Sequence, residues 1–97
     1  MSVAASKIIC VGRNYAEHAK ELGNAIPDRP VLFMKPPSSL RSLAQGIVWN
    51  RALGECHFEC EICLQIAHPL SQETNPSKVL EAIGAVTLGL DLTLRDL

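Results

Sequence analysis

Residues 55–66 show the clearest pattern of hydrophobic and polar positions in the chain. Their even-numbered positions are apolar, and their odd-numbered positions include a histidine and three glutamates. A period of two residues is typical of a β-strand, because successive side chains point to opposite faces. Residues 85–95 alternate in the same way, with valine and leucine at even positions and Asp91 among the odd ones. Both segments therefore predict strands with one apolar and one polar face.

Shorter patterns predict the remaining elements. Apolar runs indicate strands over residues 7–11 and 31–34, and residues 47–49 are a candidate for another short strand. A first helix is expected over residues 15–22, where the preceding asparagine and a later glutamate form a capping box. A second helix is expected to begin after Asn75, which is followed by a proline, and to run to about Ile83, with the next residue, a glycine, closing it. This mixture predicts a strand-rich α+β fold.

Length and composition restrict the class of protein. The chain has 97 residues, of which 47% are apolar, as expected for a single small domain over residues 1–97. The formal net charge is −1 without a basic cluster, which argues against a nucleic-acid or membrane-surface partner. No apolar run approaches the ~18–20 residues that cross a bilayer, and the start lacks the apolar core of a secretory signal. A cytoplasmic location with reduced thiols is therefore expected.

Three carboxylates fall on the polar faces of the two alternating strands. Glu59 and Glu61 share a face, about 6.6–6.8 Å apart at Cα. The position of Asp91 in the middle of a predicted strand calls for an explanation, because aspartate is depleted within strands. If the strands meet, the three carboxylates form a cage of oxygen ligands suited to Mg²⁺, Mn²⁺ or Ca²⁺. The alternatives are a solvated face for the glutamates, and an ion pair with Arg95 or a role in a turn for Asp91.

A histidine and a glutamate share one face of the first predicted helix. His18 and Glu21 stand three residues apart, so their side chains are neighbours. A carboxylate beside an imidazole orients it and raises its basicity, as a general base requires. The alternative is an ordinary pair on a helix surface.

The cysteines near His57 suggest a zinc site at first sight. On a strand, however, Cys60 and Cys63 face opposite sides, and no second pair of ligands follows downstream. A zinc site is therefore disfavoured. Cys63 lies on the polar face and is the cysteine that can contact the carboxylates.

Four sequence runs carry a resemblance to a known family. The runs are IICVGRNYAEHAKELG, RPVLFMKP, CHFECEI and LGLDLTLRD. Together they resemble the fumarylacetoacetate hydrolase family, especially its small acylpyruvase-like and 2-hydroxyhepta-2,4-diene-1,7-dioate isomerase-like members. Catalytic domains of that family are longer, with further strands, a glutamine and a later lysine. The resemblance thus identifies the chain as an incomplete domain, the N-terminal half of the catalytic β-fold.

The resemblance implies a divalent-metal-dependent hydrolase that cleaves carbon–carbon bonds in 2-oxo acids such as acylpyruvates. It implies Mg²⁺ or Mn²⁺ held by Glu59, Glu61 and Asp91, with His57 supporting these ligands. By the same resemblance, His18 and Glu21 match the family's catalytic dyad, which activates water in its hydrolases. Lys35 and Arg95 match residues that bind the substrate.

Alternative functions stay open at this point. The same family includes decarboxylases of oxaloacetate and decarboxylases or isomerases of muconate-type diacids. A truncated, non-catalytic metal-binding module is a further alternative, and so is a small domain whose acidic face is only solvated. A homodimer is implied by the resemblance alone.

Overall fold

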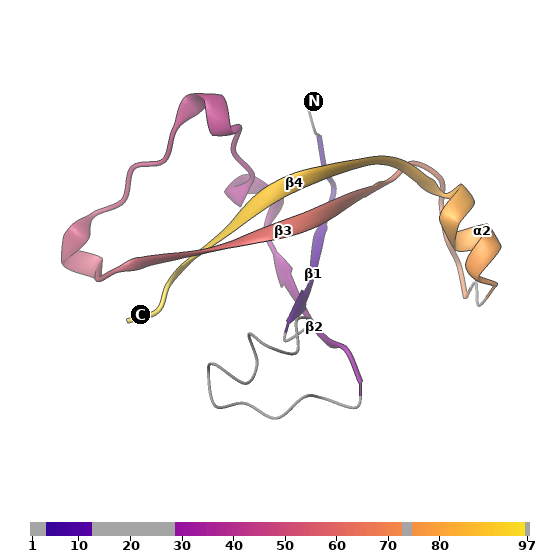
Figure 1. The fold of residues 1–97 in the computed structure, drawn as a ribbon, viewed down its shortest axis with the longest axis horizontal. Coiled ribbons are helices and arrows are strands. Elements are labelled where there is room, and N and C mark those ends of the chain that lie inside the picture. Colours follow the sequence, from indigo (N-terminus) through magenta and orange to yellow (C-terminus); the bar gives the residue numbers. More distant parts are fainter. Residues whose placement is uncertain (1–3, 13–28, 73–74, 97) are drawn as a thin grey trace. The chain divides into compact units, whose positions relative to one another are not determined.

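The computed structural model describes residues 4–12, 29–72 and 75–96. These residues form four strands and one α-helix (Figure 1). In chain order these are β1 (Ile8–Gly12), β2 (Val31–Lys35), β3 (Cys56–Ile66), α2 (Pro76–Glu81) and β4 (Ile83–Leu94). The predicted strand-rich α+β class is confirmed. The first predicted helix lies outside the described residues.

The chain divides into two compact units, Met1–Ile47 and Val48–Leu97. In the first unit, β1 and β2 pair antiparallel, and Ile8 stands opposite Lys35. Both strands were expected from their apolar runs. The residues of β1 alternate between half-buried and exposed, and those of β2 are mostly exposed, with Met34 65% accessible.

Three short 3₁₀ turns lie between β2 and β3, at Pro37–Ser39, Leu43–Gln45 and Arg51–Leu53. The last two begin with side-chain caps, since Ser42 and Asn50 accept hydrogen bonds from the backbone N–H two residues later. The suggested strand over residues 47–49 is wrong. A short apolar run forms a strand only when another strand pairs with its backbone, and the described strands pair only as β1 with β2 and β3 with β4.

The second unit is built on a long antiparallel ribbon of β3 and β4 (Figure 1). Its register places Cys56 opposite Leu94 and Phe58 opposite Leu92, so the apolar positions of both strands share one face, as predicted. This apolar face is exposed in the described structure. Phe58 is 70% accessible and Leu88 68%.

Helix α2 begins where the sequence predicts and ends earlier. The Asn75 side chain accepts a hydrogen bond of 3.0 Å from the Ser77 backbone N–H, and a proline occupies the first turn. The predicted end near Ile83 is wrong, because the helix stops at Glu81 and β4 starts at Ile83. The helix ends before Ile83 because the Ala82 carbonyl accepts a hydrogen bond of 2.7 Å from the Ala67 backbone N–H. This bond joins the residue after α2 to the residue after β3.

Gly84 has a different role from the helix-terminating one predicted for it. Ile83 pairs with Ile66 and Ala85 with Gln65, so Gly84 is the extra residue of a β-bulge. A Cβ at position 84 would lie 2.6 Å from the Ala67 Cβ, closer than carbon atoms approach. Glycine is therefore required here by the close approach of the returning chain.

In the part of the chain that the structure describes, no helix is long and apolar enough to cross a membrane.

Candidate functional site

Two of the predicted metal ligands face each other across the ribbon. Glu59 on β3 is the direct cross-strand partner of Asp91 on β4. Paired residues share a face, so the predicted meeting of these carboxylates is confirmed by the register. The Asp91 Oδ1 atom is buried, and the Glu59 side chain is 28% exposed. Like charges directly opposite each other destabilise a strand pair unless a positive charge lies near them.

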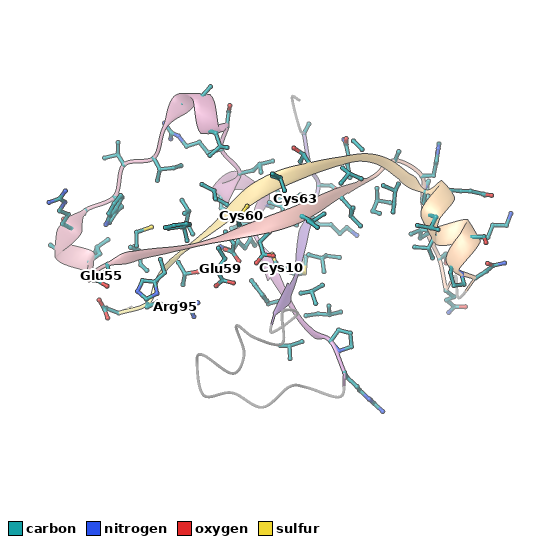
Figure 2. The ribbon with its side chains drawn as sticks, viewed as in Figure 1. Cys10, Glu55, Glu59, Cys60, Cys63 and Arg95 are labelled. Atoms are coloured by element: carbon teal, nitrogen blue, oxygen red, sulfur yellow. The ribbon has the colours of Figure 1, made fainter. Side chains whose placement is uncertain are left out.

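Arg95 supplies one such positive charge. Its Nη2 atom donates a hydrogen bond of 3.0 Å to Glu59 Oε1, and the two charges form an ion pair. Figure 2 labels both residues, with Arg95 near one end of the ribbon and Glu59 further along it. Arg95 was expected to hold an anionic substrate or to pair with Asp91. In this structure it bonds to the carboxylate opposite Asp91.

Glu61 lies one step further along the same face and faces a glycine. Its cross-strand partner is Gly89, so no side chain opposes this carboxylate. A Cβ at position 89 would lie 2.7 Å from the Cys63 Sγ atom. The Cys63 Sγ atom therefore lies over Gly89 on the polar face, and its contact with the carboxylates stays a prediction.

His57 lies beside Glu55. Its Nε2 atom lies 3.5 Å from Glu55 Oε2, and the two side chains are 50% and 87% exposed. This contact is with a solvated carboxylate just before the start of β3. The supporting role predicted for His57 stays a prediction.

Asp96 is a structural residue that the sequence pattern did not single out. Its Oδ2 atom accepts a hydrogen bond of 3.4 Å from the Glu55 backbone N–H, which joins the end of β4 to the start of β3. The contact is possible because Gly54 has no side chain, since a Cβ there would collide with Asp96. The signal in the sequence was a glycine directly before a strand, which often marks a close approach.

The donor chemistry of the polar face fits a divalent cation. Carboxylate oxygens are the preferred ligands of Mg²⁺ and Mn²⁺. A cation would also offset the repulsion between Glu59 and Asp91. In the described ranges the side chains do not gather three or more His, Cys, Asp or Glu residues around one point. The register supplies two facing carboxylates, and Glu61 as a third ligand stays a prediction.

The remaining predicted residues lie outside the described ranges or on β2 of the first unit. His18 and Glu21 lie outside the described residues, so their proximity stays a prediction. Lys35 ends β2 in the first unit and is half-buried. None of the four cysteines forms a disulfide. Cys60 stands at an even position of β3 and Cys63 at an odd one, so they lie on opposite faces of the strand.

Comparison with known proteins gives a consistent result. Residues 7–97 match the family model described as fumarylacetoacetate (FAA) hydrolase C-terminal. The chain is 45% identical over 91 residues to the oxaloacetate tautomerase YcgM of Escherichia coli, covering 94% of this chain and 41% of that protein. It is 40% identical over 91 residues to the mitochondrial oxaloacetate decarboxylase of Dictyostelium discoideum, covering 93% of this chain and 41% of that protein.

A solved structure agrees with these relatives. The putative fumarylacetoacetate isomerase/hydrolase from Oleispira antarctica superposes with a TM-score of 0.87 at 48% identity, over 94% of this chain and 40% of that one. The chain belongs to the fumarylacetoacetate hydrolase family. It spans 41% of the length of the first two curated relatives to which it is similar. Several relatives are mitochondrial by name, so the cytoplasmic location stays a prediction.

Proposed function

We propose that the protein is a divalent-cation-dependent enzyme that interconverts the keto and enol forms of oxaloacetate or a closely similar 2-oxo diacid. The observation that carries this proposal is the direct cross-strand opposition of Glu59 and Asp91, with Arg95 bonded to Glu59. The names of the relatives support this activity better than the carbon–carbon hydrolysis that the resemblance first suggested.

The chemistry of tautomerisation suits these residues. Keto–enol conversion moves one proton between C3 of the substrate and the oxygen on C2. A divalent cation, Mg²⁺ or Mn²⁺, supplies Lewis-acid stabilisation of the negative charge that develops on the 2-oxo group. In this proposal Glu59, Glu61 and Asp91 hold the cation. Its +2 charge offsets the mutual repulsion of their carboxylates.

The proton and the substrate carboxylates need separate residues. His18 and Glu21 are proposed to carry the proton, with the imidazole taking it at C3 and the carboxylate orienting the ring. The cations of Lys35 and Arg95 are proposed to bind the two carboxylates of the diacid, because charge-assisted hydrogen bonds are strong and directional. The active form is proposed to be a homodimer, which the molar mass in solution tests.

Decarboxylation of oxaloacetate is a second candidate. The relative from Dictyostelium discoideum is named for this activity. Loss of CO₂ from C4 leaves the same kind of enolate as proton removal from C3, so the same carboxylate-bound cation would serve both reactions. Product analysis separates the two, because only decarboxylation releases CO₂ and pyruvate.

The proposal is tested by following the ultraviolet absorbance of the enol form with and without Mg²⁺. Asp91→Asn is expected to lower the rate to the background level, and His18→Asn to lower it by about 10²–10⁴-fold. Glu81→Gln is the matched control, because this exposed residue at the end of α2 loses the same charge. A rate that is unchanged by chelator or by Asp91→Asn contradicts the proposal.

A further inference from the structure

Arg95 neutralises the carboxylate that is proposed to bind the cation. Its Nη2 atom lies 3.0 Å from Glu59 Oε1, and Glu59 stands opposite Asp91. The guanidinium and a divalent cation would therefore use the same carboxylate. Both side chains keep contact with solvent, at 42% exposure for Arg95 and 28% for Glu59. The pair is therefore accessible to an incoming ion.

The choice of partner by Arg95 is informative. The last register pair of the ribbon is Cys56 with Leu94, so the next step along both strands would place Arg95 opposite Glu55. The guanidinium instead bonds to Glu59, while Glu55 contacts His57. The favoured carboxylate is the one that also faces Asp91, which adds a second negative charge on that face. Electrostatic attraction to two carboxylates explains this longer reach.

We propose that Arg95 is an exchangeable counter-ion. It stabilises Glu59 in the cation-free protein, and the divalent cation displaces it, so that the guanidinium becomes available to a carboxylate of the substrate. This inference rests on the proposed function and deepens it. It makes Arg95 a substrate-binding residue that also couples cation binding to substrate binding, in the thermodynamic sense that each favours the other.

The expected size of the effect follows from the exposure of the pair. Solvent-exposed ion pairs change an equilibrium by no more than about fivefold. A doubly charged ion that binds several oxygens therefore outcompetes a single guanidinium. Removing the guanidinium should tighten cation binding by about two- to fivefold, because the competitor is lost.

Calorimetric titration of the purified protein with Mg²⁺ and with Mn²⁺ tests the exchange. Arg95→Met is expected to tighten binding by about two- to fivefold, and Arg95→Lys, which keeps the charge, to stay within about twofold of wild type. Lys78→Met in α2, at the far end of the ribbon in Figure 1, removes the same net charge and is expected to change affinity by less than about 1.5-fold.

A second measurement reports the guanidinium directly. In ¹⁵N-edited NMR spectra, the Arg95 side-chain resonance, assigned by its absence in Arg95→Met, is expected to shift as Mg²⁺ saturates the site. Cation binding without this shift overturns the exchange. Weaker binding by Arg95→Met also overturns it, since a merely structural support for Glu59 predicts that loss. An equal effect of Arg95→Met and Lys78→Met overturns it as well.

The two proposals fail in different ways. If the wild-type protein binds no divalent cation, the proposed function is wrong and the exchange falls with it. If the wild type binds a cation and Glu59→Gln abolishes this, but Arg95→Met leaves the affinity unchanged, only the exchange is wrong.

Discussion

Asp96 occupies the space beside Gly54 that a side chain would need. A Cβ on Gly54 would lie 2.9 Å from the Asp96 Cβ, and the backbone there has φ +102°. The carboxylate bonds instead to the Glu55 backbone N–H. The end of β4 and the start of β3 are thus joined through a position that admits only glycine.

Gly54→Ala in the second unit is expected to lower the free energy of unfolding more than Gly46→Ala in the first. Both glycines have a positive φ and an extended ψ, a combination found almost only for glycine, which costs other residues about 1–3 kcal/mol. A Cβ on Gly46 would meet nothing within 4 Å, whereas one on Gly54 would meet Asp96. The extra loss at Gly54 should be about 1–3 kcal/mol in urea unfolding. Adding Asp96→Gly should recover that extra loss, and no recovery would refute the contact.

Gly84→Ala is expected to lower the free energy of unfolding by about 1–3 kcal/mol. A new methyl group at the bulge would lie 2.6 Å from the Ala67 Cβ, and the two backbone segments are joined by the hydrogen bond from the Ala67 N–H to the Ala82 carbonyl. Ala67→Gly in the same chain removes the obstructing atom and should restore most of the stability. Thermal unfolding of the four combined variants measures this coupling. Additive effects of the two changes would contradict the close approach.

Gly89→Ala is expected to be milder, at less than about 1 kcal/mol. The atom in its way is Cys63 Sγ, which can rotate about χ1 to give space. The same methyl group would narrow the space opposite Glu61, so cation affinity should fall even though stability is nearly kept. Urea unfolding and calorimetry on one preparation test both parts. A loss of stability as large as that of Gly84→Ala would show that Cys63 is held rigidly.

Asp91→Asn should remove the stabilisation of the protein by divalent cations. A ligand at 100 times its dissociation constant stabilises the folded state by about 2.7 kcal/mol. Wild type should therefore unfold at a higher temperature with saturating Mg²⁺, and Asp91→Asn should not respond. Without cations, the same variant should be as stable as wild type or more so, because a like-charge cross-strand pair is removed. Glu81→Gln should behave as wild type in both conditions.

The pairing of β3 with β4 was readable from sequence because each strand alternates without interruption. Once the even positions of both strands share the apolar face, Glu59 and Asp91 must share the other, and the register confirms that they are directly opposed. Asn75 was equally readable, since a cap followed by proline is a local signal that needs no tertiary contact.

Other features depend on partners that a local pattern does not contain. The end of α2 is set by Ala67, which bonds to Ala82 from the preceding segment, so a glycine two residues later was misread as a helix stop. The preference of Arg95 for Glu59 arises between residues 36 positions apart. Residues 47–49 have the composition of a strand, but the described structure provides no neighbouring strand for them.

The bulge at Gly84 also determines where the chain tolerates a change in length. A residue gained or lost between Ala85 and Asp91 would shift the alternation by one position. Asp91 would then move to the apolar face, and a neighbouring leucine would take its place opposite Glu59. A change on the other side of the bulge, within α2, leaves that alternation intact. Among relatives, insertions and deletions are therefore expected to be more frequent before Gly84 than after it.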